Sequence, residues 1–196
     1  MKYDYIDKIL ADNDGILKTA DIVAAGICKE TFYNYAKDTE LEKAAHGIYI
    51  SPDVPVDEMF LLQTQIPKVI YSHETALYLH NLSEKEPIPL TVTVPAKYNN
   101  PTLTEKGVKI VYVKKEWYSL GICQMSSPAG YDITAYDMER TICDVIRKRS
   151  YMDISAFNYA LTEYMKQKGK DLNRLMEYAK IMRLEKRIRE TMGVLF

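Results

Sequence analysis

The first fifty residues carry three short helical patterns followed by a hairpin, and few folds accommodate that order. Residues 3–13 and 18–26 repeat apolar side chains at helical spacing, and each segment ends at a glycine or an Asn-Asp-Gly turn. Thr19 is expected to cap the second helix, and Gly26 is expected to end it in the left-handed conformation. Residues 29–38 form the third helical pattern, in which Phe32, Tyr35 and Ala36 are expected to face inward. Two short apolar runs, LEKAA and IYIS, then flank a His-Gly pair, as the strands of a hairpin do. This order predicts a winged helix-turn-helix over residues 1–52.

A segment rich in proline and acidic residues, SPDVPVDEMF, indicates a domain boundary near residues 52–57. Beyond it, a strand and a helix precede two β-branched strands, and the part from residue 137 onward is helical with a break at KGKD. Asp137 is expected to cap the first of these helices. Residues 57–196 are therefore predicted to form a mixed α/β domain with a helical C-terminal end. The chain as a whole is expected to be α+β.

The composition gives no bulk electrostatic signal of a charged partner. The 196-residue chain is 47% hydrophobic and has a formal net charge of -1, as is typical of a globular protein. Cys28, Cys123 and Cys143 show no CxxC spacing, which argues against a disulfide framework and against a zinc site. The sequence has no signal-peptide pattern and no run of about 18 apolar residues. We therefore expect a cytoplasmic protein that does not enter a membrane.

The outward face of the third helix carries groups suited to DNA. In a helix-turn-helix this helix enters the major groove, where its side chains contact base edges and phosphates. Asn34 matches adenine, Thr31 matches a thymine methyl group, and lysines match phosphates or guanine. The candidate contacts are Lys29, Thr31, Tyr33, Asn34 and Lys37, with Lys43 and His46 in the wing. The alternative is a short polar face that is merely solvated.

The charge balance of the same segment opposes DNA binding. Residues 1–51 hold six lysines and nine acidic residues, a net charge of -3, whereas DNA-binding domains usually present a basic patch. Four of the acids belong to the first helix and its end, which can face away from DNA. Neutralising about three to five phosphates would give a shallow salt dependence. We therefore expect weak binding by one copy, so that paired sites are needed.

The second domain offers no catalytic constellation. The segment SHETALYLH contains His73, Glu74 and His80. Its two histidines stand two helical turns apart, roughly 10 Å along the axis, which is too far for both to bind one zinc ion. Arg140 and Asp144 stand at i and i+4 and can pair. The acids of a single helix do not build a magnesium site. A structural role is expected for both segments, with no catalytic residue, no metal and no cofactor.

The segment DGILKTADIVAAGICKETFYNYAKDTELEKAAHGIYI resembles the N-terminal module of the AbiEi family, the antitoxin half of type IV toxin–antitoxin systems. The similarity continues through YSHETALYLHNL, TVTVP and AYDMERTICDVIRKR, and so covers nearly the whole chain. It implies a cytoplasmic bacterial repressor that binds inverted repeats in its own promoter and counteracts a nucleotidyltransferase toxin, without implying a stable complex. It also places Glu30 among the DNA-reading positions. Cys28 and His46 depart from the Ser or Thr cap and the wing arginine common in the family.

Basic residues collect at the end of the helix around residue 140 and near the C-terminus. Residues 151–196 hold nine basic and six acidic residues, a net charge of +3. The candidate patch comprises Arg147, Lys148, Arg149, Arg183, Lys186 and Arg187. A solvated helix face is the default interpretation. Contact with the DNA backbone and recognition of a nucleotide, an RNA or the toxin all stay open.

Three functions compete for this sequence. The leading hypothesis is a DNA-binding repressor and antitoxin that occludes its promoter and has no chemistry of its own. The second is a stand-alone winged-helix regulator whose C-terminal domain senses a small ligand or an RNA, and a copy without a neighbouring toxin gene would favour it. The third is a nuclease fused to a DNA reader, for which the sequence offers no acid, base or metal constellation.

Overall fold

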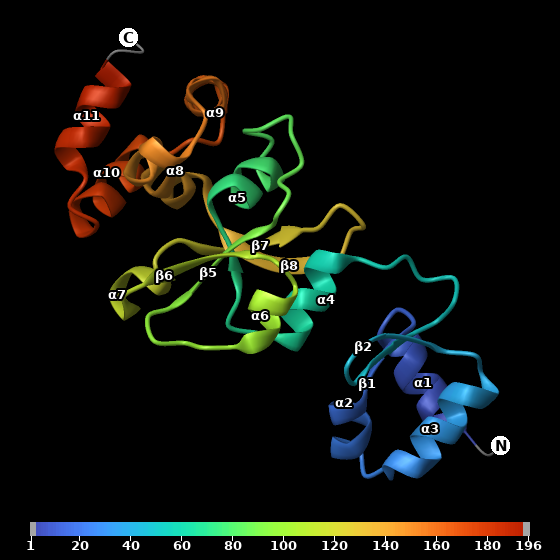
Figure 1. Cartoon of the computed structure of the whole chain (residues 1–196). Coiled ribbons are helices and arrows are strands. Elements are labelled where there is room, and N and C mark those ends of the chain that lie inside the picture. The colour runs from blue at the N-terminus through green and yellow to red at the C-terminus, as the bar shows by residue number, and fades with distance from the viewer. Residues whose placement is uncertain (1–2, 194–196) are drawn as a thin grey trace. The chain divides into compact units, whose positions relative to one another are not determined.

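The computed structural model describes residues 3–193, and over this range the chain is α+β, as predicted. The chain divides into two compact units. The first comprises the residues up to Pro67 together with Pro128–Tyr131, and the second comprises Lys68–Ser127 and the residues from Asp132 onward. Figure 1 shows the elements of both units, coloured along the chain. Within residues 3–193, every helix is too short or too polar to span a bilayer.

Helices and a small antiparallel sheet build the first unit. Its elements are α1 (Asp4–Asp12), β1 (Ile16–Lys18), α2 (Thr19–Ala24), α3 (Lys29–Asp38), β2 (Glu42–Ala45), β3 (Ile48–Ile50) and α4 (Glu58–Gln65). The strand order is β1-β3-β2, and both pairings are antiparallel. The hairpin β2–β3 was expected, whereas β1 was not. The three residues of β1 pair with the three of β3, which extends the hairpin into a sheet.

The inward face of α3 forms the centre of this unit's core. Its three residues expected to face inward are buried, and Phe32 and Tyr35 pack with Ile6, Leu17 and Ile22 from α1, β1 and α2. Burial of a side chain of this size contributes about 1.5–3 kcal/mol. The opposite face of α3 is thereby held toward solvent.

The start of α2 differs from the expected cap. Thr19 was expected to cap the helix, but the N-cap is Lys18, which makes no side-chain cap bond, because β1 runs directly into α2. The backbone amide of Thr19 donates to the Gly47 carbonyl at 2.8 Å and so joins α2 to the hairpin. After α2, Gly26 has a φ of +84°, the left-handed conformation expected of it.

The segment interpreted as a linker contains a helix, α4. The Asp57 carboxylate caps it by accepting a hydrogen bond from the backbone of the first turn at 2.8 Å. Leu61 packs against the isoleucines of β1 and β3. These contacts assign α4 to the first unit, so the units divide at Pro67 and not within residues 52–57.

The second unit is built on a mixed sheet with strand order β6-β5-β4-β8-β7. The pairs β5–β6 and β4–β8 are parallel, and β4–β5 and β7–β8 are antiparallel. Its strands are β4 (Ile70–Tyr71), β5 (Thr91–Pro95), β6 (Lys109–Val113), β7 (Ile122–Ser126) and β8 (Asp132–Tyr136). The short helices are α5 (His73–Leu79), α6 (Pro101–Glu105), α7 (Lys115–Tyr118) and the 3-10 helix η1 (Arg149–Tyr151).

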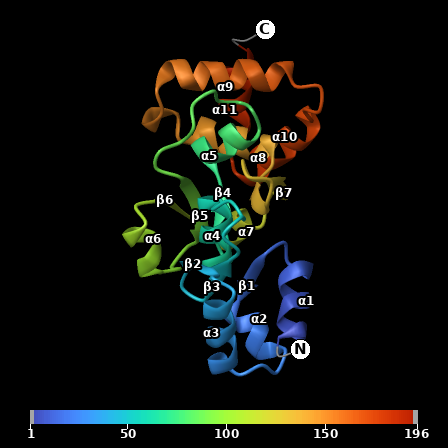
Figure 2. The ribbon, with the colours of Figure 1, turned by 90° about the vertical axis from the view of Figure 1, so that its right-hand side faces the viewer.

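Longer helices form the C-terminal part of this unit, as expected. They are α8 (Met138–Arg147), α9 (Ile154–Lys166), α10 (Leu172–Ile181) and α11 (Glu185–Gly193). Figures 1 and 2 show them on the side of the sheet that also carries α5. Asp137 caps α8, as predicted, by accepting a hydrogen bond from the Arg140 amide at 2.8 Å. Apolar residues of α8 to α11 share one buried cluster, which includes Ile142, Phe157 and Leu175.

Candidate nucleic-acid interface

The outward face of α3 carries a polar ridge, the α3 ridge, which consists of Lys29, Tyr33, Asn34 and Lys37. All four side chains are exposed. Over residues 3–193, the two lysines form no ion pair and the Asn34 amide has no hydrogen-bond partner. Their donors are therefore available to an external ligand.

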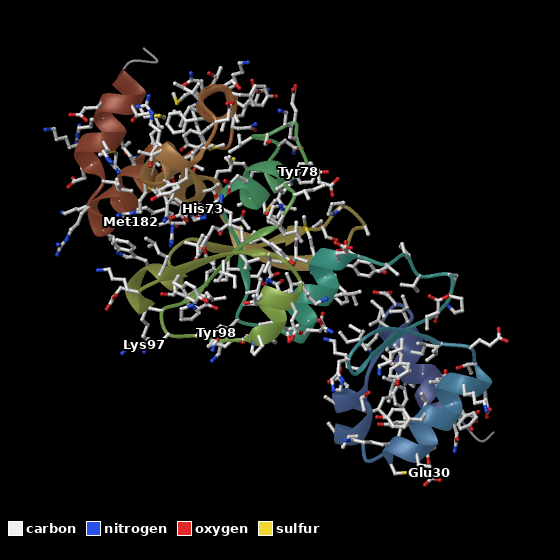
Figure 3. The ribbon with its side chains drawn as sticks, in the orientation of Figure 1. Glu30, His73, Tyr78, Lys97, Tyr98 and Met182 are labelled. Atoms are coloured by element: carbon white, nitrogen blue, oxygen red, sulfur yellow. The ribbon has the colours of Figure 1, made fainter. Side chains whose placement is uncertain are left out.

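Glu30 lies in the first turn of the same helix and is exposed (Figure 3). A carboxylate at this position interacts favourably with the positive end of the helix dipole. It can also accept a hydrogen bond from a cytosine amino group. An acid at the tip of the ridge is therefore compatible with base reading, although it repels phosphates.

Thr31 and Cys28 contact each other at the start of α3. Cys28 is the N-cap but makes no side-chain cap bond to the backbone. Its Sγ lies 3.0 Å from Thr31 Oγ1, and this contact lowers the pKa of the Cys28 thiol. Thr31 is half-buried. Its hydroxyl is thus already engaged within the first turn, unlike the groups of the α3 ridge.

An aromatic cluster supports Tyr33, and sequence reasoning missed one of its members. The Tyr49 ring on β3 lies 5.0 Å from the Phe32 ring and 6.3 Å from the Tyr33 ring, measured between centroids. Tyr49 alternates with two buried isoleucines, a period-2 pattern that places its side chain on the other face of the strand. That alternation was the signal available in the sequence. The cluster connects the α3 ridge to the hairpin.

The hairpin supplies the two further positions predicted for the wing. Lys43 on β2 is exposed and lies opposite Tyr49 in the ladder. His46 is exposed in the turn between β2 and β3, directly before Gly47, whose φ is +72°. No partner in the described part of the chain engages either side chain.

Two of the acidic residues near α3 take part in packing. The Tyr35 hydroxyl donates to Asp7 Oδ1 at 2.8 Å, and the Tyr3 hydroxyl donates to Asp38 Oδ2 at 2.9 Å. Burial, with the neighbouring Asp7, raises the pKa of Tyr35 to about 12. These carboxylates tie α1 to α3. A neutral tyrosine hydroxyl does not offset the charge of a carboxylate, so the net charge of the segment still opposes DNA binding.

Arg147, expected from the sequence to belong to an exposed basic patch, is packed within the second unit. Its guanidinium lies over the Trp117 ring, 4.2 Å from the centroid, and donates a hydrogen bond to the Met182 carbonyl. Burial lowers the pKa of Arg147. This arginine is half-buried and packs α8 against α7 and the end of α10, so it is not part of a solvated face.

The other members of the expected patch separate into two groups. Arg149 and Arg187 line one cavity of about 400 Å³ together with Arg147. The other three basic residues do not line it. Lys148 lies over the Tyr151 ring at 5.2 Å, Lys186 pairs with Glu190 at 3.8 Å, and Arg183 is exposed at the end of α10.

The histidines of the second unit lie in separate packing contacts. His73 is buried, and its Nδ1 lies 3.0 Å from Ser72 Oγ, while His80 Nε2 lies 2.7 Å from the Tyr136 carbonyl. Glu74 forms an ion pair with Lys109 at 2.7 Å. No group of three or more histidine, cysteine, aspartate or glutamate side chains within residues 3–193 is placed to hold a metal ion.

The ion pair expected in α8 forms in the interior. Arg140 Nε donates to Asp144 Oδ2 at 3.1 Å, and both side chains are buried. Glu139 accepts hydrogen bonds from the Tyr164 hydroxyl at 3.2 Å and from the Asp171 amide at 2.9 Å. The three charged residues are thus bonded within the unit.

No family model and no curated protein matches the chain. Among solved structures, the chain is similar to the crystal structure of the RV2827C protein from Mycobacterium tuberculosis. The TM-score is 0.58 at 11% sequence identity, over 91% of this chain and 71% of that chain. At this identity the likeness shows a shared fold and carries no information on activity.

Proposed function

We propose that the first unit is a winged helix-turn-helix that binds inverted repeats in the promoter of its own operon, and that the chain acts as repressor and antitoxin. The observation that carries this proposal is the α3 ridge. Its lysines and its amide lack partners within the described chain, while the opposite face of α3 is fixed by the core. The element order α1-β1-α2-α3-β2-β3 supports the same reading.

In this mechanism α3 enters the major groove. Asn34 forms two hydrogen bonds with an adenine, and Lys29 and Lys37 contact phosphates or a guanine. Lys43 and His46 contact the flanking backbone from the wing. One copy neutralises few phosphates, so its affinity is low and two copies on an inverted repeat are needed for stable occupancy. Repression follows because the bound copies occlude the promoter.

The antitoxin part of the proposal depends on the resemblance in sequence to the AbiEi family. A nucleotidyltransferase encoded next to this chain is the partner it implies, and the chain opposes the effect of that toxin without a required stable complex. The nature of the adjacent gene is therefore a direct check. A copy of the gene with no toxin neighbour would favour the alternative regulator whose C-terminal unit senses a small ligand, which the arginine-lined cavity also favours.

The test combines Lys29→Ala with Asn34→Ala. Loss of one bidentate base contact and one phosphate contact should weaken promoter binding at least 10-fold in a mobility-shift titration, roughly as expected for such contacts. Antitoxicity in cells should be retained, because both side chains are exposed and the fold does not depend on them.

The matched control combines Lys8→Ala with Asn99→Ala, which removes the same groups from exposed positions that do not belong to the α3 ridge. It should leave promoter affinity unchanged. Equal weakening by both double variants would remove the ridge from the mechanism. Equal binding of promoter and random duplex by the unmodified protein would contradict specific reading, and loss of both activities by a folded ridge variant would refute the division of labour.

A further inference from the structure

A cavity in the second unit gathers three arginines from separate elements. It lies between the end of α8, η1, the start of α9 and α11, and has a volume of about 400 Å³. Its lining consists of Arg147, Arg149, Ser150, Met152, Ile154 and Arg187. A second cavity of about 320 Å³ shares Arg149 and Arg187 with the first, so the two adjoin. The two adjoining cavities are together called the recess.

The charge of this recess is unbalanced. Among the residues that the structure describes, 3–193, no acidic side chain lines the first cavity. Glu190 lines the second but lies 3.8 Å from Lys186, with which it pairs. Asp144 is committed to Arg140 inside the unit. Like charges that lie close together without counterions repel one another and destabilise the folded state. A bound anion would offset the repulsion between these arginines.

Arg147 is half-buried, whereas Arg149 and Arg187 are exposed, and each of the three makes a contact that restrains its side chain. Arg147 is held over the Trp117 ring, and the Arg149 guanidinium lies 5.2 Å from the centroid of the Phe157 ring. Arg187 Nη1 donates to the Arg147 carbonyl at 3.4 Å. A guanidinium fixed in this way loses little side-chain entropy when it binds a phosphate, and its fork of donors matches phosphate oxygens.

The second cavity provides a different surface. Ile146, Phe157 and Leu161 give it an apolar wall, and Asn158 and Thr191 give it polar groups. An apolar wall beside an amide suits a planar ring with hydrogen-bonding edges, because the ring packs on the wall and the amide pairs with its edge. The recess thus combines a polyanion site with a site for a planar group.

We propose that this recess binds a nucleoside polyphosphate, with its phosphates between Arg149 and Arg187 in the field of Arg147 and its base against the wall formed by Ile146, Phe157 and Leu161. This site goes beyond DNA reading by the first unit. A small ligand is favoured over a DNA duplex because the arginines line a recess with apolar walls, whereas contacts to duplex phosphates need no such cavity.

Isothermal titration calorimetry of the full chain tests the proposal. The probes are ATP, GTP, inorganic pyrophosphate and adenosine. ATP or GTP should bind more tightly than pyrophosphate, which lacks the planar group, and adenosine should bind at least about 10-fold more weakly than ATP because it lacks the phosphates. The variant pair Arg149→Gln with Arg187→Gln should weaken nucleotide binding by about 10-fold or more, since it removes two charge-assisted contacts.

The matched control is Lys180→Gln with Arg183→Gln. It removes the same two charges from exposed positions of the same region that do not line the recess. Its nucleotide affinity should stay within about 2-fold of the unmodified chain, as expected for screened surface charges. Equal losses in the two variants would overturn the proposal in favour of a general basic surface.

Two further outcomes would also overturn it. One is the absence of nucleotide binding at millimolar concentration by the folded protein. The other is weakened binding of a short duplex by the Arg149 and Arg187 variant with no effect on nucleotides, which would assign the arginines to nucleic acid. Promoter binding that depends on Lys29 and Asn34 is measured separately, so failure of this site and failure of the repressor proposal are distinguishable.

Discussion

The two units use charged side chains in opposite ways. In the first unit, Asp57 is the one charged residue among those described that is buried, and it caps α4. In the second unit, α8 alone buries Glu139, Arg140 and Asp144. The first unit therefore keeps its charges where a ligand can reach them. The second commits several of its charges to its own interior.

The interior of the second unit is an extended hydrogen-bonded network around Arg140. Besides its bond to Asp144, this arginine donates to the carbonyls of Trp117 and Leu120 and lies over the Tyr136 ring at 4.1 Å. These contacts join α8 to α7 and β8. A buried charge is expensive unless it is paired and hydrogen-bonded, so this network has to form as a whole. The comparison teaches that charge content alone does not locate a binding surface.

The largest effect that would test this comparison is removal of one partner of the buried pair. Asp144→Ala leaves the Arg140 charge without its carboxylate and should destabilise the second unit by about 3–5 kcal/mol. Trp117 is the chain's single tryptophan and lies in the second unit. Its fluorescence during urea unfolding therefore reports the second unit alone.

Two companion variants make that result interpretable. Lys166→Ala breaks an exposed ion pair in which Lys166 Nζ lies 2.7 Å from Glu163 Oε1, and it should cost far less stability than Asp144→Ala because solvent screens the pair. If Asp144→Ala does not fold, the double change Arg140→Met with Asp144→Leu should restore a folded unit, because it removes both charges together. Equal, small losses for Asp144→Ala and Lys166→Ala would show that the buried network is not a determinant of stability.

A smaller effect is expected from pH, and it too should separate the units. Burial lowers the pKa of His73 and His80, both in the second unit. Each ring is neutral in the folded state, while the unfolded chain takes up protons as the pH drops through about 6.5. Their contribution to stability is complete above that pH and is lost below it. The second unit should therefore weaken between pH 7.5 and 5.5.

Hydrogen exchange of α8 and α3 peptides at the two pH values, corrected for intrinsic rates, measures this difference. Protection of α8 should decrease at pH 5.5 and protection of α3 should not, since the histidine of the first unit, His46, is exposed. His80→Gln keeps a donor for the Tyr136 carbonyl and should flatten the pH dependence. Parallel changes in α3 and α8 would show that the acid sensitivity does not arise from the buried rings.

Helices with strong apolar periodicity were predictable from the sequence. The inward residues of α3, the Asp137 cap and the Arg140–Asp144 pair all follow from i, i+3 and i+4 spacing, because these contacts are local. β1 was missed because three residues are too few to show the alternation of apolar and polar side chains that marks a strand. It forms a strand only through its pairing with β3. The helix α4 was missed because nearby prolines suggested a linker, although Asp57 before an apolar run was a usable cap signal.

The candidate sites also differ in how far they depend on local spacing. The α3 ridge could be placed from the sequence because a buried face on a helix fixes the exposed one. The partners of Arg147 could not be predicted in this way, because it contacts Trp117 and the Met182 carbonyl, which lie far from it along the chain. The arginine-lined cavity likewise depends on the meeting of α8, η1, α9 and α11.

The smallest effect concerns the cap of α3. Cys28→Ser introduces a hydroxyl oxygen that can accept a hydrogen bond from the backbone amide of Thr31, a cap that the thiol does not provide. The first unit should gain stability, seen as slower hydrogen exchange of the first amides of α3. Cys28→Ala should show no gain.

The urea midpoint reported by Trp117 should stay the same in both Cys28 variants, because the change lies in the other unit. A gain for serine without one for alanine would identify the orphan amides of the first turn as the cause. Equal exchange in the two variants would mean that the contact of the thiol with Thr31 already satisfies this helix end. In that case a cysteine in place of a Ser or Thr cap at position 28 would have no cost in stability.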